Sequence, residues 1–87
     1  MKIKEDYMLR EVAGNSVVVA VGKAVLDFNG LITLNSTGAF LWNLLREETT
    51  EEALLTAMLD GFEVDEATAK IDIAEFIDKL KGADLLV

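Results

Sequence analysis

The stretch Leu31-Ile-Thr-Leu-Asn-Ser-Thr-Gly-Ala-Phe-Leu-Trp42 predicts where the last strand ends and the first helix begins. Residues 31–34 are rich in strand-forming side chains, and the apolar residues after Asn35 have helical spacing. Asn35 itself can accept a hydrogen bond from a backbone N–H of the first helical turn. Because strand patterns precede this junction and only helical patterns follow it, we expect an α+β fold.

Three runs of strand-forming residues predict an antiparallel meander, with turn signals at Gly14-Asn15 and Asn29-Gly30. The runs are Tyr7–Val12, Ser16–Val21 and Leu31–Leu34. Residues 24–28 are expected to form either a fourth short strand or an ordered lead-in to the last one. Residues 17–21 are apolar without alternation, which is typical of a strand covered on both faces or of one with a face left for a partner.

Three helices are predicted after the junction, over Ser36–Leu45, between Thr49 and Gly61, and over Glu66–Lys81. Thr49 is expected to cap the second helix, with Glu52 completing a capping box. Asp65 is expected to cap the third helix, and residues 85–87 to fold back over the core. A three-stranded meander followed by three helices indicates a winged-helix-like arrangement in a single domain, residues 1–87.

The third helix carries three distinct strips of side chains. Its core stripe is predicted to be Ala69, Ile73, Phe76, Ile77 and Leu80, and its solvent face Thr68, Asp72, Glu75 and Lys79. The remaining strip consists of Ala67, Lys70, Ile71, Ala74, Asp78 and Lys81. Ile71 lies roughly 160° around the helix from Ile73, so it should miss the core. Small alanines beside an off-core isoleucine are what a shallow groove wall would require, although a wider buried face or one stray exposed isoleucine would give the same pattern.

The composition argues against catalysis by this chain. Its 87 residues include no cysteine and no histidine, which removes thiol nucleophiles, imidazole acid–base chemistry and thiolate zinc sites. No calcium loop or phosphate-binding glycine motif is present, so we expect no cofactor and no metal. No apolar run suits a membrane helix, and no secretory leader is visible, so a cytoplasmic protein without membrane contact is expected.

The net charge of −8 bears on the choice of partner. Phosphate backbones repel such a chain, which disfavours the use of the fold as a nucleic-acid-binding regulator. Strand addition is favoured, because an edge strand offers unpaired N–H and C=O groups that an extended peptide can complete. A docking or oligomerisation module that uses residues 17–21 is the remaining alternative, and monomer and homodimer are both left open.

Motifs along nearly the whole chain resemble those of the PqqD-like family. They are Leu34-Asn35-x-Thr37-Gly38-Ala39-x-x-Trp42, Thr49-x-Glu51-Glu52, Phe62-x-Val64-Asp65, Asp72-Ile73-x-x-Phe76-Ile77-x-x-Leu80 and Leu85-Leu86. The family usually has glycine before the final Leu-Leu, where this chain has Asp84.

The resemblance implies a non-catalytic peptide chaperone with a winged-helix-like fold. Such domains bind the leader of a ribosomally made precursor peptide as an added strand, between the third strand and the third helix, and present it to a maturation enzyme, often of the radical S-adenosylmethionine class. Carried onto this sequence, the edge would be Leu31, Ile32, Thr33 and Leu34. The groove wall would be Lys70, Ile71, Ala74, Asp78 and Lys81, with Ala67 joining them on the same helical strip.

Overall fold

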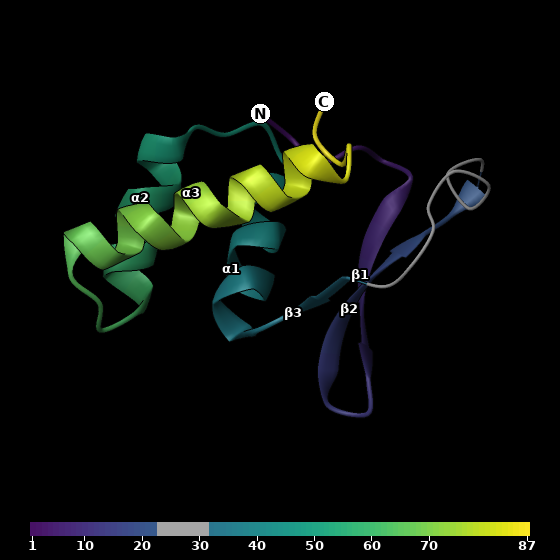
Figure 1. Cartoon of the computed structure of the whole chain (residues 1–87), viewed down its shortest axis with the longest axis horizontal. Helices are drawn as coiled ribbons and strands as arrows, with labels where there is room; N and C mark the ends of the chain where they lie inside the picture. Colours follow the sequence, from purple (N-terminus) through teal and green to yellow (C-terminus); the bar gives the residue numbers. More distant parts are fainter. Residues whose placement is uncertain (23–31) are drawn as a thin grey trace.

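The computed structural model describes residues 1–22 and 32–87, in which three strands precede three helices (Figure 1). The elements are β1 (Tyr7–Val12), β2 (Asn15–Ala20), β3 (Ile32–Leu34), α1 (Ser36–Leu45), α2 (Glu51–Gly61) and α3 (Glu66–Gly82). This order confirms the α+β class and the meander-then-helices architecture. The expectations for residues 24–28, for the Asn29-Gly30 turn and for Leu31 lie outside the described residues.

The sheet is antiparallel throughout, with strand order β1-β2-β3. Ala13 and Gly14 form the turn between β1 and β2 with φ values of 52° and 83°. Two left-handed residues in a row give the primed turn whose twist suits a hairpin. The predicted Gly14-Asn15 loop was therefore wrong by one residue, because Asn15 already pairs with Val12 as the first residue of β2.

Helix α1 begins as its sequence predicts. The Asn35 side chain accepts a hydrogen bond from the Gly38 N–H at 2.8 Å. Gly38 is buried where three elements meet. A Cβ at this position would lie 3.2 Å from the Asn35 Oδ1 atom, 3.3 Å from the Leu34 Cβ atom and 3.4 Å from the Phe76 ring. The glycine at this position therefore permits the close approach of β3, α1 and α3.

Helix α2 begins one residue later than the capping-box pattern indicates. Its N-cap is Thr50, whose hydroxyl accepts from the Ala53 N–H at 3.1 Å. Thr49 is occupied elsewhere, since its N–H donates to the Met1 carbonyl at 3.0 Å. The prediction of a Thr49–Glu52 capping box was wrong because the N-terminal segment of the chain binds the Thr49 backbone.

Helix α3 is capped by Asp65, which accepts from the Thr68 N–H at 2.7 Å. That backbone hydrogen bond, followed by one from the Thr68 hydroxyl, lowers the pKa of the Asp65 carboxyl below its usual value. The helix ends at Gly82, and Asp84 takes a left-handed φ of 59°, a conformation that favours glycine. Its carboxylate pairs with the Lys4 ammonium at 3.0 Å, so the turn joins the C-terminal segment to the N-terminal one.

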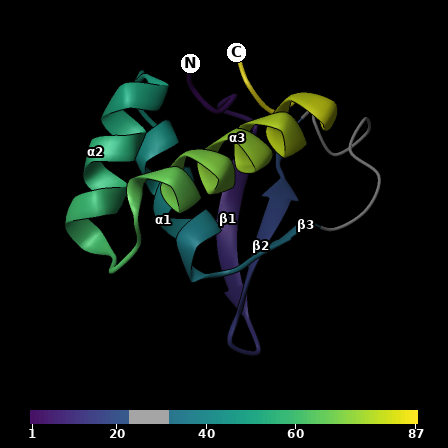
Figure 2. The ribbon, with the colours of Figure 1, turned by 60° about the vertical axis from the view of Figure 1, so that its left-hand side comes forward.

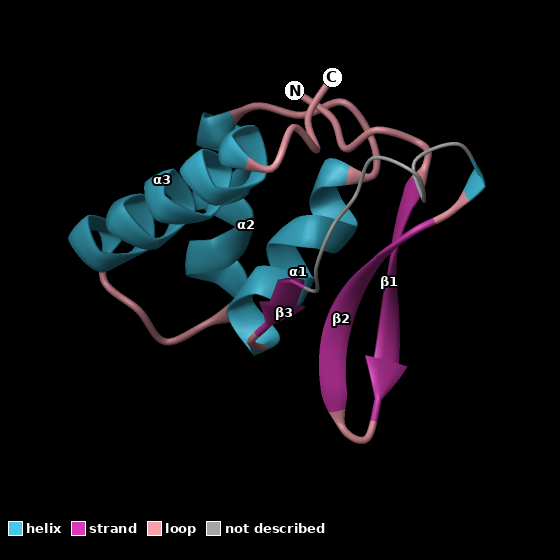
Figure 3. Cartoon of the chain, turned by 45° about the vertical axis from the view of Figure 1, so that its right-hand side comes forward, coloured by secondary structure: helices cyan, strands magenta, loops and turns pink. Residues whose placement is uncertain are grey.

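The core lies between the sheet and the three helices, and Figure 3 shows the helices on one side of the β1–β2 hairpin. All five residues of the predicted α3 core stripe are buried, together with Val18, Leu41, Trp42, Leu45, Leu54, Met58 and Leu85. The two ends of the chain meet over this core, where Ile3 and Leu86 form an isolated bridge. Of the helices in the described ranges, none is long and apolar enough to span a membrane.

Candidate functional site

Strand β3 forms an edge of the described sheet, since its only strand partner there is β2. Ile32 and Leu34 turn their side chains toward the core, and Thr33 is exposed. The three side chains alternate as a strand requires. Within Ile32–Leu34, what β3 offers to a partner is therefore its backbone and the Thr33 side chain.

The pairing register identifies Thr33 as the residue whose backbone points out of the sheet. Val12 and Asn15 close the hairpin as a hydrogen-bonded pair. Because hydrogen-bonded and non-hydrogen-bonded pairs alternate, Glu11–Ser16 is a non-hydrogen-bonded pair and Arg10–Val17 is the next hydrogen-bonded one. Val17 therefore directs its N–H and C=O toward β1. Thr33 stands opposite Val17 in β3 and so directs its own N–H and C=O away from β2.

A cleft of about 580 Å³ separates this edge from α3. In Figure 2, α3 runs across the view above the end of β3 that leads into α1. The residues that line the cleft are Asn15, Thr33, Leu34, Asn35, Thr37, Gly38, Leu41, Asp72, Glu75, Phe76 and Lys79. An edge strand and a helix wall thus stand on opposite sides of one hollow, which is the geometry that strand addition requires.

The helix wall of the cleft is charged above an apolar floor. Phe76 is 8% exposed and forms part of the core, whereas Asp72, Glu75 and Lys79 reach the surface. In the described part of the chain none of these three charged side chains forms an ion pair. Two carboxylates and one ammonium group are thus available to a bound molecule, and the local balance is negative.

The structure corrects the sequence prediction of which α3 strip faces β3. Ala67, Lys70, Ile71, Ala74, Asp78 and Lys81 are all exposed, and none of them lines this cleft. Ile71 is 58% exposed on the helix face away from the core. Lys70 lines a separate hollow between α2 and α3, where its ammonium lies 3.5 Å from Glu66.

The physical reason is that an amphipathic helix has two flanks, and its own periodicity cannot say which neighbour occupies each. Here β3 lies beside the flank that contains Phe76, and α2 packs on the other flank. The strip assigned to solvent therefore supplies Asp72, Glu75 and Lys79 to the cleft.

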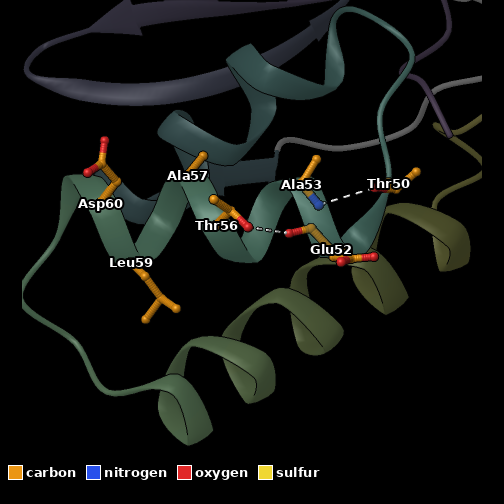
Figure 4. Close-up of a pocket in the computed structure, with 7 residues that line it drawn as sticks. All are labelled: Thr50, Glu52, Ala53, Thr56, Ala57, Leu59 and Asp60. Carbon is orange, nitrogen blue, oxygen red and sulfur yellow. Dashed lines mark hydrogen bonds between the residues drawn. The ribbon is translucent and has the colours of Figure 1, made fainter.

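The outward face of α2 does not provide a comparable site (Figure 4). Its shallow hollow is lined only by α2 residues and the N-cap Thr50. The Thr50 hydroxyl accepts from Ala53, and the Thr56 hydroxyl donates to the Glu52 carbonyl at 3.1 Å. These hydroxyl groups thus form hydrogen bonds within the helix itself, and in the described part of the chain the hollow has no lining residue from a second element.

The comparisons with known proteins place this arrangement in a family. The model of the family described as coenzyme PQQ synthesis protein D (PqqD) matches residues 15–86. The chain belongs to the PqqD family. The match runs from β2 to the C-terminal segment and leaves β1 outside it. No curated protein sequence matches this PqqD-family chain.

A solved structure shares the fold of this PqqD-family chain. It is that of TbiB1 in complex with the TbiA(beta) leader peptide, with a TM-score of 0.75 and 23% sequence identity. The alignment covers 99% of this chain and 94% of that one. The three-strand, three-helix arrangement is therefore shared over nearly the full length of both chains.

Proposed function

We propose that this chain binds the leader segment of a ribosomally made precursor peptide by adding it as a strand to β3. The observation that carries the proposal is the outward-facing backbone of Thr33 opposite the α3 wall. Membership of the PqqD family supports it, as does the shared fold with TbiB1, whose structure contains a leader peptide.

Affinity and selectivity come from different parts of the cleft. The Thr33 N–H and C=O supply main-chain hydrogen bonds, which any extended peptide can accept and donate. Side chains of the guest that face α3 meet the edge of Phe76 and the charges of Asp72 and Glu75. A leader with a basic residue beside an apolar one suits this wall, because Asp72 and Glu75, which form no ion pair within residues 1–22 and 32–87, outnumber the single Lys79.

The chain acts as a carrier and not as the catalyst in this proposal. It holds the leader and presents the rest of the precursor to a maturation enzyme, which we propose to be of the radical S-adenosylmethionine class and cytoplasmic. A homodimer is compatible with this role. A nucleic-acid-binding role is not favoured, since the net charge is −8 and α3 carries Asp72, Glu75 and Asp78 beside Lys70, Lys79 and Lys81.

Thr33→Pro tests the strand-addition step directly. Proline removes the outward N–H, and its ring is tolerated on an edge strand whose N–H does not serve the sheet. We expect about tenfold weaker binding or more, measured by calorimetry with the leader segment of the precursor peptide that the parent chain binds, because a buried guest carbonyl loses its donor.

The matched control is Thr33→Val, which keeps the N–H and the branched shape of the side chain. It should bind the leader nearly as well as the parent chain. Equal binding by the proline variant, with an unchanged amide spectrum for the rest of the protein, would show that the peptide does not pair with β3.

A further inference from the structure

A second cleft, of about 570 Å³, lies at the opposite edge of the sheet, between β1 with the preceding N-terminal segment and α1. Trp42 and Leu9 contribute apolar surface to it, and Trp42 is also a core residue at 1% exposure. The full lining is Lys2, Ile3, Lys4, Glu5, Tyr7, Met8, Leu9, Arg10, Glu11, Ser16, Val21, Ala39, Trp42, Asn43 and Arg46. The plan of the β3–α3 cleft, an edge strand facing a helix, is therefore repeated here.

The charge of this second cleft is opposite to that of the chain. Four of the eight lysine and arginine residues in the sequence line it, against two carboxylates. Lys4 is paired with Asp84. In the described ranges Lys2, Arg10 and Arg46 form no ion pair, so their charges are available to a ligand. A local positive region on a protein of net charge −8 selects an anionic partner.

The outer edge of β1 indicates that this partner is a polypeptide. The alternation that orients the backbone of Thr33 applies to β1 as well. Its residues Leu9 and Glu11 direct their N–H and C=O groups away from β2. On the outer face of the hairpin, Met8 and Val12 are 42% and 56% exposed. An unpaired backbone edge beside exposed apolar side chains suits an added strand.

We propose that the β1–α1 cleft binds an acidic, extended segment of a partner protein as a strand on β1. Acidic side chains on the face of that strand toward α1 meet Lys2 and Arg46. Side chains on its other face meet Met8, Val12 and Arg10, which lies between them on the outer face of β1. A phosphate backbone would offer no strand to the β1 edge, and the overall negative charge repels it. Because β1 and β3 are opposite edges of the sheet, this site and the proposed leader site can be occupied together, and neither depends on the other.

The experiment is an amide-spectrum titration of the full chain with a short peptide in which glutamate alternates with valine or threonine. We expect shifts in residues 7–12 and 39–46, and affinity that falls as salt is raised. Arg10→Glu combined with Arg46→Glu should weaken binding about tenfold or more, with an unchanged melting temperature. The matched control is Lys70→Glu combined with Lys81→Glu, which makes the same change in net charge away from this cleft and should alter affinity less than twofold.

Each other outcome overturns the proposal. Equal losses in both double variants would mean that net charge alone drives binding. Shifts confined to residues 32–34 and 72–79 would show that the acidic peptide binds in the β3–α3 cleft instead. Tighter binding of a short DNA duplex at residues 7–12 would identify the partner as a nucleic acid, and no binding at low salt would leave the cleft without this role.

Discussion

The two edges of the sheet are built alike and charged differently. At one edge β3 faces α3 across a cleft whose available charges are Asp72, Glu75 and Lys79, and at the other β1 faces α1 across a cleft with four cations. The fold thus provides the same device twice, a backbone edge opposite a helix. This difference indicates that the charged side chains lining each cleft determine which partner binds there.

The largest expected effect concerns Trp42, which joins the second cleft to the core. Trp42→Ala should lower the free energy of unfolding by about 4 kcal/mol, because a fully buried indole leaves a cavity. Urea denaturation followed by circular dichroism measures this loss. Trp42→Phe, which retains a ring, should lose distinctly less. A small loss for the alanine variant would show that the β1–α1 cleft can collapse and is not a fixed feature.

Gly38 tests the corner of the first cleft. Helix propensity alone favours Gly38→Ala, but the new Cβ would crowd Leu34, Asn35 and Phe76. Overpacking should prevail and lower the stability by about 1–2 kcal/mol, measured by thermal unfolding. Gly82→Ala is the matched control. No atom lies within 4 Å of its new Cβ, so it should leave the stability equal or slightly higher. If both substitutions change the stability equally, the space around Gly38 can accept a Cβ, and the close packing of β3, α1 and α3 does not require glycine there.

Ala13 lies in the turn that links β1 to β2, the strand between the two edges of the sheet. Its φ of 52° is unfavourable for a residue with a Cβ. Ala13→Gly should therefore raise the free energy of unfolding by about 0.5–1 kcal/mol. Gly14→Ala, at a φ of 83°, should change it in the opposite direction. Chemical denaturation of both variants decides whether the left-handed turn is strained as described.

The smallest effect is expected at Ile71. Because its side chain is exposed and lies outside the β3–α3 cleft, Ile71→Glu should leave both the stability and the affinity for the leader peptide nearly unchanged. Glu75→Lys, which inverts a charge inside the cleft, should change that affinity several-fold. If only the Ile71 variant loses binding, the leader peptide contacts the strip of α3 that the sequence predicted, which contains Ile71. It would then not bind in the β3–α3 cleft.

Sequence patterns predicted the elements well where one local signal dominated. Asn35 and Asp65 cap helices as expected, because a short polar side chain before an apolar helical run has few other uses. The Thr49 cap failed because a contact with Met1, distant in sequence, competes for its backbone. The hairpin turn shifted by one residue because both Ala13 and Asn15 neighbour the glycine, and only the ladder selects between them.

By itself, the sequence determined the order of strands and helices, the core stripe of α3 and the edge strand before Asn35, because each depends on local periodicity and capping. Only the tertiary structure decided which flank of α3 faces β3. It also revealed that lysines and arginines from the N-terminal segment, β1 and α1 converge on one cleft. The physical reason is that a helical or strand period orders the side chains around their own element, whereas the partner of each face is set by how the elements pack together.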